Sequence, residues 1–248
     1  MKTAAFLLLA SFAGAAQATE CREETYQGDS YTICEVDLVT EELRLFLRDD
    51  QGDILGSFWA VDAALAEQGK SLGFAMNAGM YHEDRAPVGY YLEDGVEAQR
   101  VISNAGPGNF GLLPNGVLCL RDGRADVIET LTFLALEPEC VSATQSGPML
   151  VIDGALHPRF LKDSTSRYIR NGVGTTADGL RAVFVISNNV VNFYQFGSLF
   201  RDHLELPNAL YFDGNVSRVR APTLGRDDIG FSSLGPIIGV VKDAASSD

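Results

Sequence analysis

Short segments in which apolar and polar residues alternate run along much of the chain. Residues 31–39 and 43–47 show this period of two, which is typical of strands that bury one face. Mostly apolar runs at residues 149–152, 209–212 and 237–241 suit strands that are buried on both faces. These five segments predict a chain that is rich in strands.

Turn signals predict how some of these strands are connected. Residues 173–187 are predicted to form a hairpin that turns at Asp178-Gly179, and residues 109–120 a second one around Pro114-Asn115-Gly116. Asp-Gly pairs that begin at residues 94, 122 and 153 are also expected to be turns between strands. The pair Asp213-Gly214 differs, because an apolar and aromatic strand leads directly into it.

Two segments carry helical signals. Ser57 is a predicted N-cap for a helix that runs to about residue 68 and ends at the glycine that follows. Apolar residues at helical spacing between Phe193 and Leu204 predict a second helix, which Pro207 ends. No repeat or linker interrupts the chain. We therefore expect an α+β fold, in which a strand-rich, twisted, mixed or antiparallel sheet packs with a few helices in a single domain, residues 19–248.

The first 18 residues have the parts of a secretory signal peptide. Lys2 supplies a positive charge, residues 4–16 form an apolar stretch, and Ala16-Gln17-Ala18 matches a small-x-small cleavage site. The apolar stretch is too short to span a bilayer, and the alternative interpretation is a buried N-terminal helix. The sequence therefore predicts an exported protein, periplasmic or secreted, that does not insert into the membrane.

Composition and charge narrow the choice of partners. Hydrophobic residues make up 46% of the 248 residues, which suffices for a buried core and argues against disorder. The chain carries 33 acidic and 19 basic side chains, a net charge of −14 at neutral pH. Without a basic surplus, nucleic-acid binding would lack counterion release, its main source of affinity. We therefore expect no nucleic-acid partner.

All four cysteines follow the predicted cleavage site. An even number of cysteines in an oxidising compartment indicates two disulfides, for which three pairings are possible. The spacings match no Cys-x-x-Cys motif. We favour Cys21–Cys34, which would tie the new N-terminus to the first strand, together with Cys119–Cys140; the alternative is four unpaired core thiols.

Several common catalytic motifs do not occur in the sequence. The three histidines lie far apart, whereas a zinc or two-metal hydrolase normally needs clustered nitrogen and carboxylate ligands. The sequence has no Gly-x-Ser-x-Gly elbow, no P-loop and no Gly-x-Gly-x-x-Gly motif. It therefore predicts no metal-ligand cluster and no cofactor, and His82 is the histidine that we keep as a site candidate.

Small and polar residues cluster at the predicted ends of strands. Asn77 follows an apolar run and precedes two tiny residues, which would let the backbone approach a ligand while the amide donates and accepts hydrogen bonds. A second cluster leads into the predicted strand at residues 149–152. Each cluster could equally be an ordinary turn or strand lead-in. The candidates from these two clusters are Asn77, Gly79, His82, Gln145, Ser146 and Gly147.

Two further clusters add charge. Residues 167–174 place Arg170 beside two glycines, and an arginine can engage two oxygens of a phosphate or carboxylate at once; the alternative is a solvated basic patch. Residues 211–217 carry Asp213 at the end of an apolar strand, a common position for a catalytic carboxylate. The candidates from these clusters are Arg170, Asn171, Asp213, Gly214 and Ser217.

Taken in order, five stretches between residue 74 and about residue 222 resemble the phosphodiester glycosidase family, and the chain is most similar to its short exported bacterial branch. The stretches are Asn77-Ala78-Gly79-Met80 with Pro87-Val88-Gly89, Gly108-Asn109-Phe110 with Pro114-Asn115-Gly116-Val117, Ser146-Gly147-Pro148-Met149-Leu150, Arg170-Asn171-Gly172-Val173-Gly174, and Ala209-Leu210-Tyr211-Phe212-Asp213-Gly214. The uncovering-enzyme branch has a Gly-Gly-Gly run after the aspartate and an Arg-Thr in place of Arg170-Asn171, so the resemblance does not identify the sugar.

The resemblance implies an exported hydrolase that cleaves a sugar-1-phosphodiester. Asp213 would act at the anomeric carbon, Arg170 would hold the phosphate, and Asn77 with Gln145 and Ser146 would bind the sugar hydroxyls; Asn109 is a further candidate for substrate binding. One alternative is a non-catalytic exported protein that binds a sugar phosphate or glycan, and another is a structural envelope protein whose glycines mark turns. Convergence of Asn77, Arg170 and Asp213 in one cleft would argue against the structural alternative.

Overall fold

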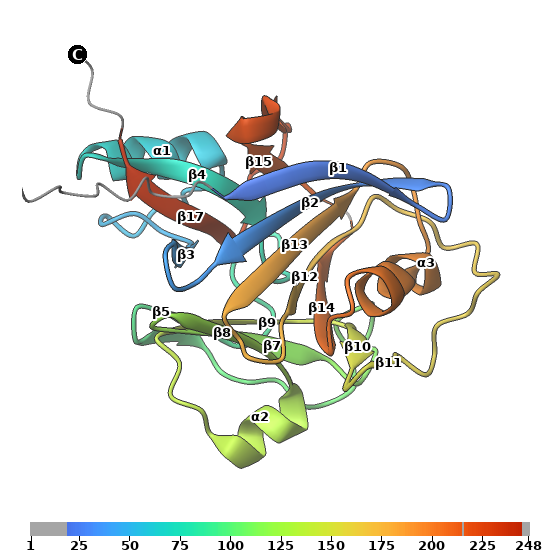
Figure 1. Cartoon of the computed structure of the whole chain (residues 1–248). Helices are drawn as coiled ribbons and strands as arrows, with labels where there is room; N and C mark the ends of the chain where they lie inside the picture. Colours follow the sequence, from blue (N-terminus) through green and yellow to red (C-terminus); the bar gives the residue numbers. More distant parts are fainter. Residues whose placement is uncertain (1–18, 215, 245–248) are drawn as a thin grey trace, which may run out of the picture.

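Strands make up most of the regular structure and form three sheets (Figure 1). The computed structural model describes residues 19–214 and 216–244. The predicted signal peptide lies outside the described residues, so it and the domain boundary at residue 19 stay predictions. The α+β fold is confirmed, and neighbouring strands pair antiparallel in all three sheets.

The largest sheet has seven strands in the order β1-β2-β13-β12-β14-β10-β11. Its strands are Glu20–Tyr26 (β1), Asp29–Asp37 (β2), Arg181–Ser187 (β13), Asn171–Thr175 (β12), Asn208–Asp213 (β14), Met149–Ile152 (β10) and Ala155–Leu156 (β11). In the pairing of β12 with β14, Asn171 lies opposite Asp213. The first residue of one strand is therefore beside the last residue of the other.

Two smaller sheets flank the large one, at its upper left and beneath it in Figure 1. The upper sheet has the order β16-β15-β4-β17-β3, formed by Arg226–Asp227, Val219–Ala221, Lys70–Asn77, Ile237–Asp243 and Glu42–Phe46. The lower sheet has the order β6-β5-β9-β7-β8, formed by Val96–Gln99, Tyr91–Glu93, Ser142–Ser146, Gly116–Arg121 and Arg124–Glu129.

Both predicted helices are present, and a third was not predicted. Helix α1, Phe58–Ala66, begins at its predicted cap, because the Ser57 hydroxyl accepts a hydrogen bond from a main-chain N–H of the first turn at 3.1 Å. The second predicted helix is α3, Phe193–Ser198, which continues as a π-helical turn, η1, at Leu199–His203. The unpredicted α2, Thr130–Leu136, is too short and too uniformly apolar to show a helical period.

The predicted Asp-Gly turns are confirmed. The glycines of the first four pairs, Gly95, Gly123, Gly154 and Gly179, all have a positive φ between 65° and 81°, and each joins two paired strands. Gly214 has no such backbone conformation. The fifth Asp-Gly pair is therefore not a hairpin turn, which agrees with the distinction drawn from the sequence.

The predicted hairpin at residues 109–120 is wrong. Only β7 at its C-terminal end is a strand, and β7 pairs with β8 and β9 rather than with residues before it. The preceding residues form turns because the buried Asn115 side chain holds them: its Nδ2 donates to the Phe110 carbonyl at 3.2 Å, and its Oδ1 accepts from Thr130 Oγ1 at 2.7 Å.

The main core joins all three sheets. Buried side chains of β4, β5, β7, β13 and β14 pack into one cluster that includes Phe74, Tyr91, Leu118, Phe184 and Phe212. A second cluster lies under α3 and η1 and contains Phe196, Phe200 and Tyr211. Burial of this apolar surface fixes β4, β12 and β14 relative to one another. The ends of these strands form the candidate site.

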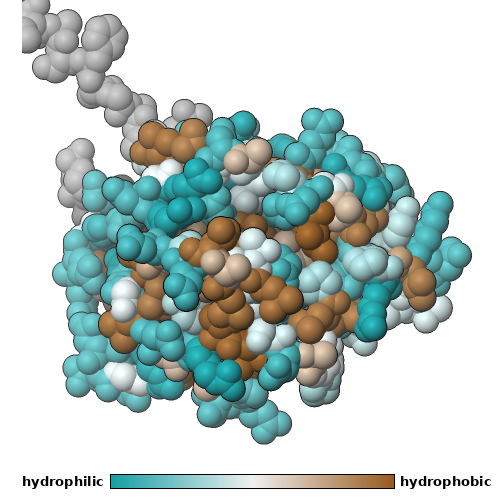
Figure 2. Space-filling model, turned by 90° about the horizontal axis from the view of Figure 1, so that it is seen from below, coloured by the Kyte–Doolittle hydropathy of each residue, from teal (hydrophilic) through white to brown (hydrophobic). Residues whose placement is uncertain are grey.

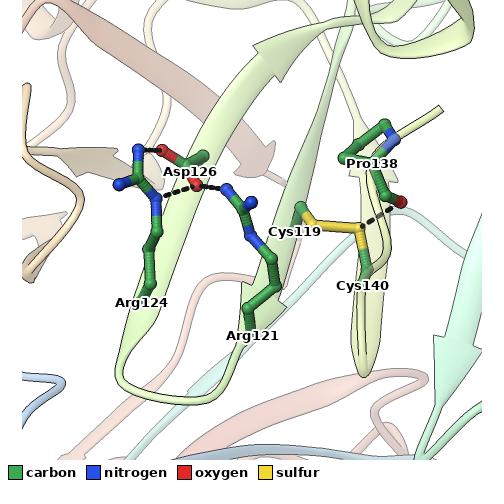
Figure 3. The surroundings of a disulfide bond; sticks show 6 residues. All are labelled: Cys119, Arg121, Arg124, Asp126, Pro138 and Cys140. Atoms are coloured by element: carbon green, nitrogen blue, oxygen red, sulfur yellow. Dashed lines mark hydrogen bonds and ion pairs between the residues drawn. A yellow bond between two sulfur atoms is a disulfide. The ribbon is translucent and has the colours of Figure 1, made fainter. Parts of the chain in front are cut away.

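Both predicted disulfides are confirmed. Cys21–Cys34 joins directly paired residues of β1 and β2, and Cys119–Cys140 joins β7 to the segment before β9 (Figure 3). Asp126 lies opposite Cys119 on β8 and forms ion pairs with Arg121 and, at 2.8 Å, with Arg124 (Figure 3). Two disulfides suit a protein that folds in an oxidising compartment.

The lower face of the molecule carries apolar side chains among hydrophilic ones (Figure 2). Helix α2, which lies at the bottom of Figure 1, exposes Leu131, Leu134 and Leu136. Among the described residues, no helix has the length and apolar character needed to cross a membrane.

Candidate functional site

Strand ends from two sheets meet at the candidate site. Asn77 is the last residue of β4, Asn171 the first of β12 and Asp213 the last of β14. Asn77 and Asn171 are completely buried, whereas Asp213 is partly exposed. Residues that lie 94 and 42 positions apart in the chain are thus brought together by the packing of the sheets.

The Asn171 amide forms the centre of a hydrogen-bond network. Its Nδ2 donates to the main-chain oxygen and to Oδ1 of Asn77, both at 3.0 Å, and its Oδ1 accepts from the Asp213 N–H at 3.0 Å. Asn77 Oδ1 also accepts from the Arg218 N–H at 2.8 Å, where β15 begins. These buried bonds connect the upper sheet to the seven-stranded sheet and fix where β14 ends.

Neighbouring residues form hydrogen bonds with both the side chain and the main chain of Asp213. Asp213 Oδ1 accepts from the Gly214 N–H at 2.6 Å. Ser217 Oγ lies 3.0 Å from the Asp213 carbonyl and 3.3 Å from Asn171 Oδ1. Gly214 and Ser217 also line an open depression in the surface, together with Arg218. Asp213 is therefore a partly exposed residue next to Gly214, which lines a surface depression, and its main-chain N–H is held by the buried network.

The predicted anion-binding residue Arg170 is completely buried. Its Nε donates to the Val191 carbonyl at 2.9 Å, its Nη2 donates to the Ser166 carbonyl at 3.0 Å, and its Cζ lies 3.7 Å from the centre of the Phe193 ring. Burial lowers the pKa of Arg170. Nη1 has no hydrogen-bond partner among the described residues. Instead of the open cationic pocket that was predicted, the structure has a buried guanidinium with one unpartnered nitrogen.

Tyr211 connects Arg170 with Asp213. The Arg170 Cζ lies 5.4 Å from the centre of the Tyr211 ring, and Tyr211 and Asp213 share one face of β14 because they are two residues apart. Burial raises the pKa of Tyr211, the Arg170 charge lowers it and the Asp213 charge raises it, so that it lies well above its ordinary value. Its buried Oη has no partner at hydrogen-bond geometry within the described residues. The phenol is therefore neutral at physiological pH.

Tyr81 is a second buried phenol near Asp213. It follows β4 in the chain, and its buried Oη likewise has no partner in the described part of the chain. Burial raises the pKa of Tyr81, and the Asp213 charge raises it further. Sequence reasoning missed both phenols as site residues. The available signal was a tyrosine, rather than a phenylalanine, two positions before Asp213 in an apolar strand.

Gln145 and Ser146, which were predicted from the cluster before residues 149–152, form hydrogen bonds within the protein core. The Gln145 amide uses all its positions on protein groups: Oε1 accepts from the N–H groups of Tyr90 and Ile102, and Nε2 donates to the Ile102 carbonyl and to Thr130 Oγ1. Ser146 Oγ donates to a main-chain carbonyl of β14 at 2.8 Å. These groups support the site from within the core.

The predicted glycines and loop residues occupy different positions around the site. A Cβ at Gly79 would lie 2.5 Å from Thr144 Oγ1, and one at Gly147 would lie 2.6 Å from Asn115 Cβ, so both glycines permit close packing. His82 is exposed and held through its main chain. Asn109 is also exposed and lies near the Tyr211 phenol; burial raises the pKa of Tyr211, and Asn109 acts in the opposite direction. No group of three His, Cys, Asp or Glu residues that could hold a metal occurs among the described residues.

The chain belongs to the phosphodiester glycosidase family, whose model matches residues 71–221. This range contains Asn77, Arg170, Asn171, Tyr211 and Asp213. The chain is also 34% identical over 215 residues to the uncharacterized protein YigE of Escherichia coli K12, an alignment that covers 87% of this chain and 82% of YigE.

Solved structures share the fold at low sequence identity. The zebrafish N-acetylglucosamine-1-phosphodiester alpha-N-acetylglucosaminidase catalytic domain, auto-inhibited by its pro-peptide, superimposes with a TM-score of 0.60 at 11% identity, covering 93% of this chain and 85% of that chain. A hypothetical protein from Synechocystis gives a TM-score of 0.59 at 13% identity, with 90% and 61% covered. A putative exported protein of Burkholderia pseudomallei gives 0.56 at 11% identity, with 86% and 74% covered. At these identities the likeness establishes the fold.

Proposed function

We propose that the protein is an exported hydrolase that cleaves the bond between a sugar anomeric carbon and a phosphodiester oxygen. Family membership supports the reaction class. The observation that carries the proposal is the partly exposed Asp213 carboxyl group, whose main-chain N–H is held by the buried Asn171 amide at 3.0 Å. A carboxylate fixed in this way at a strand end is suited to act on a substrate in the adjoining depression.

The chemistry of the leaving group explains how one carboxylate can suffice. In most glycosidases a second carboxyl group protonates the leaving-group oxygen. A phosphate monoester leaves as a stable anion, so this protonation is less necessary. The oxygen of water bonds to the anomeric carbon, and the electron pair of the broken bond leaves with the phosphate, with net release of one proton. Asp213 acts as the nucleophile or as the base for that water.

The buried groups behind Asp213 have a supporting role in this proposal. The buried Tyr211 phenol stays neutral behind Asp213 and lies between it and Arg170, and the buried Arg170 charge favours a negative phosphate in the depression through low-dielectric surroundings. Export is proposed on the disulfides and on the signal-like residues 1–18, and N-terminal sequencing of the secreted protein tests it.

Replacement of the carboxylate tests the proposal. We expect Asp213→Asn to abolish turnover of a panel of chromogenic sugar-1-phosphodiesters while the free energy of unfolding stays within about 0.5 kcal/mol of wild type, because the main-chain hydrogen bond is kept. Asp122→Asn, which changes a carboxylate in the β7–β8 turn, is the matched control and should keep full activity. Full activity of Asp213→Asn contradicts the catalytic role. Binding without turnover by the wild type favours a sugar-phosphate-binding protein instead.

A further inference from the structure

Two neighbouring depressions lie beside the end of β14. The depression beside Gly214 and Ser217 shares Arg218, Asp228 and other lining residues with a second depression, which extends to the N-terminal end of α1. The second depression is also lined by Trp59 of α1 and by the loop that contains Phe231. Because the two depressions have these lining residues in common, we treat them together and name them the Trp59–Phe231 groove.

Two aromatic side chains at the far end of this groove are almost completely exposed. Trp59, the single tryptophan of the chain, is 77% exposed, and Phe231 is as exposed as in an extended chain. One comes from a helix and the other from a loop, and both line the same depression. Exposure of large rings costs hydrophobic free energy, so aromatic residues grouped in a groove beside a site indicate a binding surface.

The groove wall is an ordered structure. The Leu234 N–H donates to the Gly56 carbonyl at 2.8 Å, which ties the loop to the start of α1. Next to Phe231, Arg218 Nη2 donates to Ser232 Oγ at 3.1 Å, and before Phe231 the Asp228 N–H donates to the Val219 carbonyl at 3.0 Å. The main chain of the loop is therefore held on both sides of Phe231.

The lining combines aromatic rings with hydroxyl, carboxylate and guanidinium groups. Asp227 is exposed, and Ser232 and Ser233 offer hydroxyls beside Phe231. The carboxylates and the net charge of −14 disfavour a polyanion, and charged walls disfavour a lipid chain. Neutral sugars suit both the aromatic and the polar groups of the lining. Their C–H faces stack on aromatic rings, and their hydroxyls donate hydrogen bonds to carboxylates.

We propose that the Trp59–Phe231 groove binds a neutral carbohydrate chain that extends from the sugar phosphate at Asp213, so that the substrate is a glycan rather than a single sugar. The inference rests on the proposed function, because that reaction places the scissile bond at one end of the groove. The groove then selects substrates by the length of the sugar chain.

The single tryptophan provides a direct binding assay that needs no turnover. We expect cellohexaose, chitohexaose or maltohexaose to change the Trp59 fluorescence of the full mature protein in a saturable way. Phe231→Ala should raise the Kd about tenfold, the contribution of one stacked ring. Leu131→Ala, which shortens an exposed side chain on α2, is the control and should leave the Kd unchanged. Absence of a response to all three oligosaccharides, or an equal response to phosphatidylcholine vesicles, overturns the proposal.

A kinetic experiment separates failure of the groove from failure of the reaction. Trp59→Ala should raise KM about tenfold for a phosphodiester that bears an oligosaccharide and leave KM unchanged for one that bears a single sugar. An equal KM change on both substrates, or none on either, overturns the groove assignment while the hydrolase stands. Fluorescence binding in Asp213→Asn as tight as in wild type supports the groove independently of turnover, and loss of that binding counts against it.

Discussion

Substitution of Gly214 by alanine tests the contact between the Tyr211 phenol and the Asp213 turn. A Cβ at Gly214 would lie 2.1 Å from Tyr211 Oη, whereas the ring carbon Cζ would be 3.3 Å away. Relief of the overlap requires a shift of about 1 Å in the hydroxyl or in the turn. Overpacking of this kind costs about 1–3 kcal/mol of the free energy of unfolding.

Tyr211→Phe provides the matched partner, because it removes only the overlapping atom. The Tyr211 hydroxyl has no protein partner at hydrogen-bond geometry within the described residues, so its removal alone should change stability by less than about 1 kcal/mol. In the Tyr211→Phe background, Gly214→Ala should then cost less than about 1 kcal/mol. The expected coupling free energy between the two positions is therefore about 1–2 kcal/mol.

Urea denaturation of the wild type, both single variants and the double variant measures this coupling. Turnover adds an independent readout: a 1 Å displacement beside Asp213 should lower kcat about 100-fold in Gly214→Ala. The reasoning is refuted if Gly214→Ala destabilises the protein equally with tyrosine or phenylalanine at position 211, because the cost would then lie elsewhere.

Two further predictions concern the framework around the site. Asn171→Ala leaves the Asp213 N–H and the Asn77 carbonyl without their buried partner, so chemical denaturation should show a loss of about 2–5 kcal/mol. Burial raises the pKa of Asp126 while its arginine partners lower it, and the arginines prevail. Its stabilising effect is therefore present above the unfolded-state pKa and is lost as pH falls through the folded-state pKa, so the stability difference between wild type and Asp126→Asn should shrink on acidification below about pH 4. A difference that grows on acidification would contradict the assignment.

Local chemistry explains which parts of the fold could be predicted from the sequence. The Ser57 cap and the Asp-Gly turns were predicted correctly, since each depends on residues a few positions apart. The hairpin at residues 109–120 was wrong because Asn115 bonds to Phe110 and Thr130, and the second of these contacts is not local. The order of strands in the three sheets depends on such long-range packing throughout, which periodicity does not contain.

The candidate site shows the same limit. Asn77 and Asp213 were predicted because polar residues at the ends of apolar strands stand out in a sequence, and the structure brings them together through Asn171. The burial of Arg170 could not be predicted, because an arginine beside glycines has the same sequence pattern whether it faces solvent or the core, and the tyrosine two positions before Asp213 places a phenol near the carboxyl group without showing that it is buried.

The residues of the proposed site differ in how far they also stabilise the fold. The Asn171 amide joins two sheets and also holds the Asp213 N–H, so substitutions there change folding and the position of the carboxylate together. Trp59 and Phe231 lie on the surface, and their loss removes little buried area. If the groove binds the proposed glycan, substitutions of Trp59 or Phe231 should alter that binding at little cost in stability, whereas substitutions of Asn171 should change stability and the position of the Asp213 carboxyl group together.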